Sequence, residues 1–269
     1  MNEIDIKASM IDKDAVIHLA AISNDPTGNI DKDITYKINV HGTKIVADYA
    51  KMAGVKRFIY ASSSSVLGIQ EGEDVTEETT PNPLTPYSKS KLEAEKYVIS
   101  LNSNDFVTVA IRPATICGVS SRQRFDLVVN ALTGSAFYDG KITLYGKDQR
   151  RPNVAMSDII NIYTLMLTAN EKDIAGEVFH AGWENMSIGL IAKYVRAEFF
   201  KKYKKEIPIE IKETTDPRDY HITSEKLENL YCPHYNIKAA IADLIKIMEL
   251  GFIGNYKQDK YHNMKVLCK

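Results

Sequence analysis

The sequence predicts an α/β protein built on a doubly wound parallel sheet. Residues 15–21 are apolar almost without a break, as in a parallel strand that is buried on both faces. Apolar residues within 34–53 recur at helical spacing, and Gly54 fits the end of that helix. The alternation then continues with a strand, a helix and a strand, at 58–61, 87–101 and 106–111. This order favours parallel strands joined by helices that cover the sheet.

After Gly118 the alternation becomes irregular. We expect helices at 125–132, 157–169, 188–200 and 236–250, and strands at 141–145 and 178–181. The strand at 178–181 can return to the main sheet. A small second region built from the C-terminal half therefore follows the parallel sheet.

Composition narrows the class of protein. The 269 residues carry a formal net charge of −1, which gives no field for nucleic acid or an anionic membrane. Three scattered cysteines without metal-ligand spacing fit a reducing compartment and predict no metal site. The first residues lack the basic and apolar regions of a signal peptide, and no apolar run is long enough to span a membrane. We therefore expect a cytoplasmic protein.

A helix that carries a candidate proton-transfer pair begins near residue 85. Thr85 suits the N-cap position and Pro86 the first helical position. Tyr87 and Lys91 are one helical turn apart, so they share a face near the exposed beginning of that helix. The ammonium favours the phenolate and would lower a phenol pKa that is ordinarily near 10.

This spacing alone is weak, because it is more often an ordinary exposed pair. It occurs twice more in the polar C-terminal tail, at Tyr256/Lys260 and Tyr261/Lys265. The first pair differs in its context, since an apolar strand that ends in a run of serines, including Ser63, precedes it. A strand-end hydroxyl, a phenol and an ammonium can then reach one point.

Several motifs follow one another in order along nearly the whole chain. They lie at 14–21 (DAVIHLAA), 39–43 (NVHGT), 58–68 (FIYASSSSVLG), 87–91 (YSKSK), 112–115 (RPAT), 151–154 (RPNV) and 216–220 (DPRDY). As a set they resemble the extended short-chain dehydrogenases/reductases, in the NAD-dependent epimerase/dehydratase group that acts on nucleotide sugars. The resemblance implies a Rossmann-like fold at 1–182, with 119–151 contributing to a substrate lobe at 183–255, and a polar tail at 256–269.

The resemblance assigns catalysis to Ser63, Tyr87 and Lys91. Tyr87 as phenolate would take a proton from a sugar hydroxyl while the adjacent carbon gives hydride to NAD, and Ser63 would orient the oxygen. The implied NAD contacts are Ala20, Ala21, Asn39, Ser62, Tyr87, Lys91, Pro113 and Ile116. Simpler roles stay open, because a strand-end serine can bond its own backbone and Asn39 can be a structural polar residue.

The resemblance also implies residues that contact the substrate. These are Asn24, Ser64, Asn130, Arg151 and Arg218. Guanidinium groups suit diphosphate oxygens, although an arginine in a surface ion pair is the plainer alternative, and Asn24 fits a simple turn equally well.

The type of reaction is narrowed by the residues after Ser63. Sugar 4,6-dehydratases have an Asp-Glu pair where this chain has Ser64 and Ser65, which argues against a dehydratase. The expected function is an NAD-dependent nucleotide-sugar epimerase. An NAD(P)H-dependent keto-sugar reductase and a non-catalytic nucleotide-sugar-binding remnant are the alternatives.

The Gly-x-x-Gly-x-x-Gly turn that holds the NAD pyrophosphate in this family is absent from the sequence. NAD binding is therefore doubtful, and the strand at 15–21 would become an edge strand. We expect an N-terminally truncated fold, which is a fragment, completes its sheet with another chain, or is a degenerate homologue. We also expect a homodimer through the 34–53 and 87–101 helices, as the resemblance implies.

Overall fold

The computed structural model describes residues 3–70, 75–214 and 221–267, and it consists of two compact units. Unit 1 comprises residues 1–70, 76–113 and 160–181, and unit 2 comprises residues 71–75, 114–159 and 182–269. Each unit has a hydrophobic core of its own.

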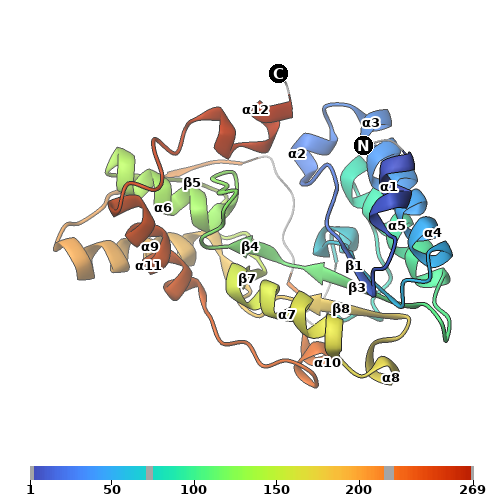
Figure 1. The fold of residues 1–269 in the computed structure, drawn as a ribbon. Coiled ribbons are helices and arrows are strands. Elements are labelled where there is room, and N and C mark those ends of the chain that lie inside the picture. Colours follow the sequence, from blue (N-terminus) through green and yellow to red (C-terminus); the bar gives the residue numbers. More distant parts are fainter. Residues whose placement is uncertain (1–2, 71–74, 215–220, 268–269) are drawn as a thin grey trace. The chain divides into compact units, whose positions relative to one another are not determined.

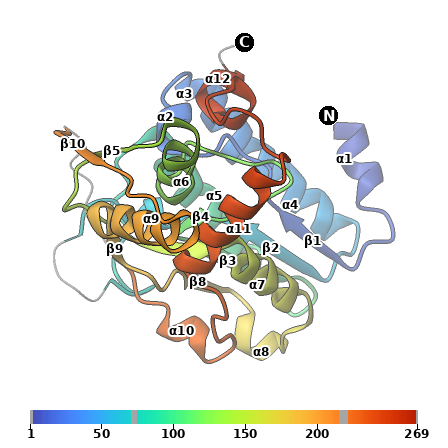
Figure 2. The same ribbon diagram turned by 90° about the vertical axis from the view of Figure 1, so that its left-hand side faces the viewer.

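A parallel sheet forms the centre of unit 1. Its strands are β1 (Ala15–His18), β2 (Arg57–Ala61), β3 (Val107–Pro113) and β8 (Glu177–Ala181), in the order β1-β2-β3-β8. Figure 1 labels β1, β3 and β8, and Figure 2 labels all four strands. All three strand pairs are parallel, so the four carboxyl ends lie along one edge. The predicted α/β fold with a parallel sheet is confirmed.

Helices lie on both faces of this sheet. Phe58 and Tyr60 of β2 pack into a core that also contains Ala47 of α4 (Thr43–Met52) and Ala94 of α5 (Pro86–Ser100). Arg57 precedes Phe58 and therefore points to the opposite face, where its guanidinium donates to the backbone oxygen of Met166 at 2.8 Å. Met166 belongs to α7 (Met156–Thr168), which lies with α8 (Glu171–Ile174) across the sheet from α4 and α5 (Figure 2).

The helix predicted at 34–53 is irregular. It consists of α3 (Lys32–Tyr36), a π-helical segment η1 (Lys37–Gly42) and α4, while α1 (Glu3–Ser9) packs against α4. Wider π-helical turns are frequent at functional sites. Here the wide turn carries Asn39, one of the predicted site residues.

The first strand is shorter and more exposed than predicted. β1 ends at His18, and Leu19 beyond it is 60% exposed. Among the described residues β2 is its sole neighbour, and Ala15, Val16 and Ile17 are only half-buried. The apolar run is therefore not buried on both faces, and β1 is an edge strand of the described sheet, as was expected for 15–21.

Unit 2 is organised around three helices. These are α6 (Val128–Asp139), α9 (Ile188–Tyr203) and α11 (Ile237–Glu249), whose apolar faces form one core. The pairs of short strands are β5 (Ile142–Tyr145) with β10 (Ile209–Lys212), β4 (Thr115–Cys117) with β7 (Asn153–Ala155), and β6 (Arg150–Arg151) with β9 (Met186–Ser187).

Shorter helical turns complete both units. They are α2 (Asp25–Gly28), η2 (Ser64–Leu67), α10 (Glu225–Glu228), η3 (Asp259–Tyr261) and α12 (Asn263–Leu267). The predicted polar tail at 256–269 thus contains two helical turns, with Tyr261 buried. Across the described ranges, no helix combines the length and the apolar character needed to cross a bilayer.

Candidate active site

The first turn of α5 is fixed by a reciprocal cap. The Thr85 hydroxyl accepts from the backbone N–H of Ser88 at 3.1 Å, and the Ser88 hydroxyl accepts from the backbone N–H of Thr85 at 3.0 Å. Pro86 follows at the first helical position, as predicted. Tyr87 and Lys91 are 8% and 3% exposed, so their shared face is buried rather than exposed.

Lys91 is buried beside an aromatic ring. Its Nζ is 4.4 Å from the centroid of the Tyr60 ring, and the Tyr60 hydroxyl donates to the Lys91 backbone oxygen at 3.5 Å. Burial lowers the pKa of Lys91 to about 7, against the opposing effect of the Glu95 carboxylate. The ammonium can therefore lose its proton near neutral pH.

His18 shares this environment. Its Nε2 lies 3.0 Å from the Thr43 hydroxyl, and its ring stacks with Tyr60 at 6.1 Å between centroids. Burial and then the charge of Lys91 lower the pKa of His18 to about 4. His18 is consequently neutral at pH 7.

Ser63 connects β2 to η2. Its hydroxyl oxygen accepts from the Ser65 backbone N–H at 3.2 Å and from the Ser65 hydroxyl at 3.0 Å. The alternative of a serine that bonds its own backbone is thus present here. Because the Ser63 oxygen acts as acceptor in both bonds, its own O–H remains able to donate. Since α5 contacts η2, Ser63 lies in the same part of unit 1 as Tyr87 and Lys91.

The predicted NAD contacts fall in different environments. Ala20 is exposed, Ala21 is half-buried, and Pro113 ends β3 opposite Ala181 of β8. Ile116 lies in β4 of unit 2. Ser62 is buried, and its hydroxyl has no hydrogen-bond partner within the described part of the chain.

Asn39 is fully buried, and its side chain bridges two elements through hydrogen bonds. Its Oδ1 accepts from the Ile22 backbone N–H at 2.8 Å. Its Nδ2 donates to the Ile22 backbone oxygen at 3.1 Å and to the Ser90 hydroxyl at 3.0 Å. These bonds join the loop after β1 to α5, so Asn39 has a structural role whether or not it also contacts a cofactor.

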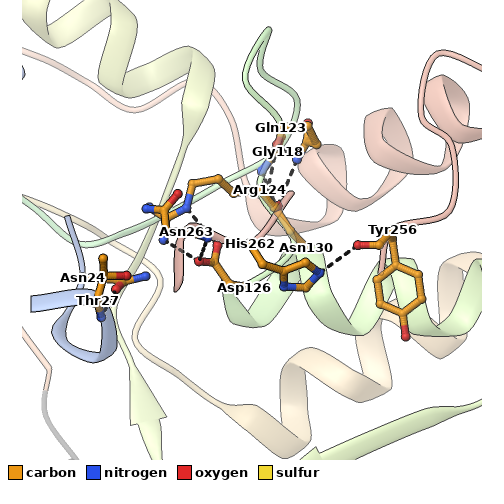
Figure 3. A network of polar contacts seen from close by, with 10 residues as sticks. All are labelled: Asn24, Thr27, Gly118, Gln123, Arg124, Asp126, Asn130, Tyr256, His262 and Asn263. Atoms are coloured by element: carbon orange, nitrogen blue, oxygen red, sulfur yellow. Dashed lines mark hydrogen bonds and ion pairs between the residues drawn. The ribbon is translucent and has the colours of Figure 1, made fainter. Parts of the chain in front are cut away.

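Two of the predicted substrate contacts lie in unit 1. Asn24 has φ of 80°, and its Oδ1 accepts from the Thr27 backbone N–H at 3.0 Å, which caps α2 (Figure 3). This is the simple turn that the sequence left open. Ser64 is buried in η2.

Asn130, Arg151 and Arg218 are the other three. The Asn130 Oδ1 accepts from the Gly118 backbone N–H at 3.0 Å, and its Nδ2 donates to the Arg124 backbone oxygen at 2.9 Å, so Asn130 holds the loop before α6 (Figure 3). Arg151 is 8% exposed and donates to the Arg150 backbone oxygen at 2.8 Å. Arg218 lies outside the described residues.

Unit 2 also contains a cavity of about 690 Å³. Residues 119–123 line it together with residues from 247 to 266 of the C-terminal segment. Asn130 and Arg151 are not among the lining residues. This cavity therefore gives no support to the predicted substrate contacts.

Sequence reasoning missed a buried ion pair next to Lys91. Arg112 of β3 donates to both carboxylate oxygens of Glu95, from Nε at 2.9 Å and from Nη2 at 2.7 Å. Glu95 follows Lys91 by one helical turn on the predicted helix, and Arg112 follows a strongly apolar strand. From these two positions, the sequence could have predicted an ion pair one helical turn after Lys91.

Comparisons with known proteins identify the family of this chain. The family model "NAD dependent epimerase/dehydratase family" matches residues 2–182. A UDP-glucose 4-epimerase from Lactobacillus helveticus is 29% identical over 222 residues, which is 76% of this chain and 65% of that protein. The chain thus covers slightly less than two thirds of that relative.

Other relatives differ in their substrates. A decarboxylating sterol-4-alpha-carboxylate 3-dehydrogenase from Candida albicans is 26% identical over 270 residues, covering 85% of this chain and 74% of that protein. The crystal structure of UDP-glucuronic acid 4-epimerase from Bacillus cereus, with UDP-glucuronic acid and NAD, superposes with a TM-score of 0.79 at 27% identity. That match covers 93% of this chain and 81% of the epimerase. From the family match over most of its length, we conclude that this chain belongs to the NAD-dependent epimerase/dehydratase family.

Proposed function

We propose that this protein is an NAD-dependent nucleotide-sugar epimerase in which Tyr87 exchanges a proton with a sugar hydroxyl. The observation that carries the proposal is the buried Tyr87–Lys91 pair on the capped first turns of α5. Low exposure strengthens the attraction between a phenolate and an ammonium, so Lys91 can stabilise the charge that forms on Tyr87.

Ser63 supplies a hydrogen bond to the reacting oxygen. Its oxygen already accepts two bonds from Ser65, which leaves the O–H to donate to a sugar oxygen as that oxygen loses its proton. Ser64 and Ser65 offer hydroxyls and no carboxylate. An elimination of water needs an additional acid and base, so these residues favour epimerisation over dehydration.

Two buried residues, Ser62 and Lys91, suit the nicotinamide end of NAD. The buried Ser62 hydroxyl lacks a hydrogen-bond partner among the described residues, and the Lys91 ammonium is buried in the same unit. Both would hold polar groups of the cofactor, which, when bound, accepts and returns a hydride at the sugar carbon. The sequence has no Gly-x-x-Gly-x-x-Gly turn, and no residue is assigned to the pyrophosphate.

The substrate class is a nucleoside diphosphate sugar. Arg151 and Arg218 are the proposed diphosphate contacts, because a guanidinium can donate to two phosphate oxygens at once. The L. helveticus and B. cereus relatives act on UDP-sugars, which supports this class. The sterol dehydrogenase relative supplies the contrasting class for the experiment.

The proposal is tested by incubating the purified chain and NAD with a panel of nucleotide sugars and one sterol carboxylate, and identifying the products by NMR. Epimers of a nucleotide sugar are expected. Tyr87→Phe should lower kcat by about 100-fold or more with little change in KM, because it removes the proton-transfer group. Tyr256→Phe is the matched control, since Tyr256 has the same spacing to a lysine and should leave kcat unchanged.

Other outcomes would replace the proposal. Oxidation of NADPH with a keto-sugar and no epimer would identify a reductase. Thermal stabilisation by a nucleotide sugar and none by NAD would identify a binding protein without catalysis. Full activity of Tyr87→Phe would remove Tyr87 from the mechanism.

A further inference from the structure

The Glu95–Arg112 ion pair fixes the orientation of both side chains. Both carboxylate oxygens of Glu95 receive a guanidinium N–H, and the two side chains are 3% and 5% exposed. The remaining Arg112 nitrogen, Nη1, lies 3.4 Å from Nε2 of the buried His180. A carboxylate held at two points by a planar fork has little freedom to turn toward a third group.

Lys91 is the next charged group on the same face of α5. Within the described residues, no ion pair joins its Nζ directly to Glu95, and Nζ lies instead over the Tyr60 ring. The titratable or charged groups around Lys91 come from several elements. Those nearest in the chain or in the fold are Tyr87 and Glu95 on α5, His18 on β1 and Tyr60 on β2. Arg112 on β3 binds Glu95 and lies beside His180 on β8, and Tyr163 on α7 lies near Tyr87. Glu95 is the carboxylate that Arg112 binds, and the Glu77 carboxylate accepts from the backbone N–H of His180 at 2.6 Å.

We propose that Glu95, held in place by Arg112, is a positioning residue that keeps Lys91 charged while withholding a direct ion pair from it. The Lys91 ammonium then remains over the Tyr60 ring instead of folding back onto Glu95. The importance of this arrangement for catalysis rests on the proposed function, whereas the effect on the charge of Lys91 does not.

The two partners have opposite effects on Lys91. Glu95 raises the pKa of Lys91 against the larger effect of burial, so removal of its negative charge must lower that pKa further. Removal of Arg112 leaves an uncompensated carboxylate free to approach Lys91, which must raise the pKa. A pair too far from Lys91 to influence its charge would give no such opposite shifts.

The experiment follows the Lys91 side chain directly by NMR. In the chain labelled with ¹³C-lysine, the Cε signal of Lys91 is identified by its absence in Lys91→Met and titrated between pH 5 and 11, with no cofactor or substrate. The wild-type signal should titrate near pH 7, as the value of about 7 implies. Glu95→Gln should move the midpoint to lower pH by about one unit or more, and Arg112→Gln should move it to higher pH.

Three further variants complete the test. Glu95→Asp retains the charge and should keep the midpoint near the wild-type value. Glu171→Gln removes a carboxylate that lies 3.7 Å from Arg57 and is 60% exposed, and it should leave the midpoint unchanged. If either single variant of the pair does not fold, Glu95→Gln/Arg112→Met removes both buried charges and should still lower the midpoint.

Identical midpoints in wild type and Glu95→Gln would overturn the proposal, as would shifts of the same sign in Glu95→Gln and Arg112→Gln. These results do not depend on whether the chain is an epimerase. If it is one, Glu95→Gln should also lower kcat about 10-fold with KM unchanged, because fewer molecules carry the ammonium that stabilises the Tyr87 phenolate.

Discussion

Tyr87 is packed against backbone as well as against side chains. A Cβ added to Gly28 of α2 would lie 2.8 Å from Cβ and 3.2 Å from the backbone N of Tyr87. Neither of those atoms is at the end of a flexible side chain, so α5 or α2 would have to move. The position of the phenol thus depends on a residue with no side chain.

Gly28→Ala should therefore destabilise the protein by about 1–3 kcal/mol, the usual effect of overpacking a tight contact. It should also lower kcat, because the phenol moves with its backbone. Urea unfolding and steady-state kinetics measure the two effects. Gly42→Ala is the matched control, since the nearest atom to its added Cβ is 3.8 Å away, and alanine suits a helix better than glycine.

A Gly28→Ala protein that unfolds at the wild-type urea concentration would contradict the close contact between α2 and Tyr87. A kcat that falls equally in both variants would show that the loss is not specific to the Tyr87 contact.

At this scale the sequence predicted that Tyr87 and Lys91 share one face of a helix, but not what surrounds them. Tyr87 and Lys91 are one turn apart, and a spacing within one helix is readable from sequence. The burial of Lys91 depends on Tyr60 and His18 from two different strands, and the partner of Glu95 comes from a third. Contacts between residues distant in sequence are not contained in local patterns.

The element with the greatest influence on the candidate site is α5. Its cap links it to another element as well, because the Thr85 hydroxyl donates to Asp25 of α2 at 2.5 Å while it accepts from Ser88. Thr85→Ala should cost about 1–2 kcal/mol of unfolding free energy and lower kcat, because the first turn carries Tyr87. Thr85→Ser should restore both quantities, since it retains the hydroxyl.

Ser187→Ala is the matched control for that prediction. Ser187 caps α9 in unit 2 by accepting from the Leu190 backbone N–H at 3.2 Å. A similar loss of stability with normal kcat is expected. If Thr85→Ala leaves kcat unchanged, the rigidity of the first turn of α5 does not matter for the reaction.

Most elements with regular periodicity were predictable, and most short ones were not. Strands β2 and β3 and helices α5, α9 and α11 lie within a few residues of their predicted bounds. The predicted helix at 125–132 instead runs from Val128 to Asp139 as α6. The pairs β4·β7 and β6·β9 involve three or fewer residues per strand, and such strands owe their form to a distant partner rather than to a sequence pattern.

For the molecule as a whole, we propose a homodimer through α3, η1, α4 and α5. Several large apolar side chains on α3, η1 and α4 are exposed: Ile34 by 49%, Tyr36 by 39%, Ile38 by 43% and Met52 by 74%. Large apolar side chains left exposed along consecutive helical segments favour an interaction surface. Sedimentation analysis should therefore show a dimer, and Ile38→Lys/Met52→Lys should shift it to the monomer.

Ile211→Lys provides the control, because Ile211 is 59% exposed and lies in unit 2 on β10. It should leave the sedimentation coefficient of the dimer unchanged. A wild-type chain that sediments as a monomer at all concentrations would contradict the proposed dimer.

The bonds made by Asn39 have a mechanical consequence. The side-chain amide of Asn39 is fully buried, and it forms hydrogen bonds to the main chain of Ile22 and to the hydroxyl of Ser90. The loop after β1 is thereby coupled to α5, the helix that carries Tyr87. A ligand that displaces the loop around Ile22 would therefore also displace α5. Ligand binding at that loop would then change the position of Tyr87.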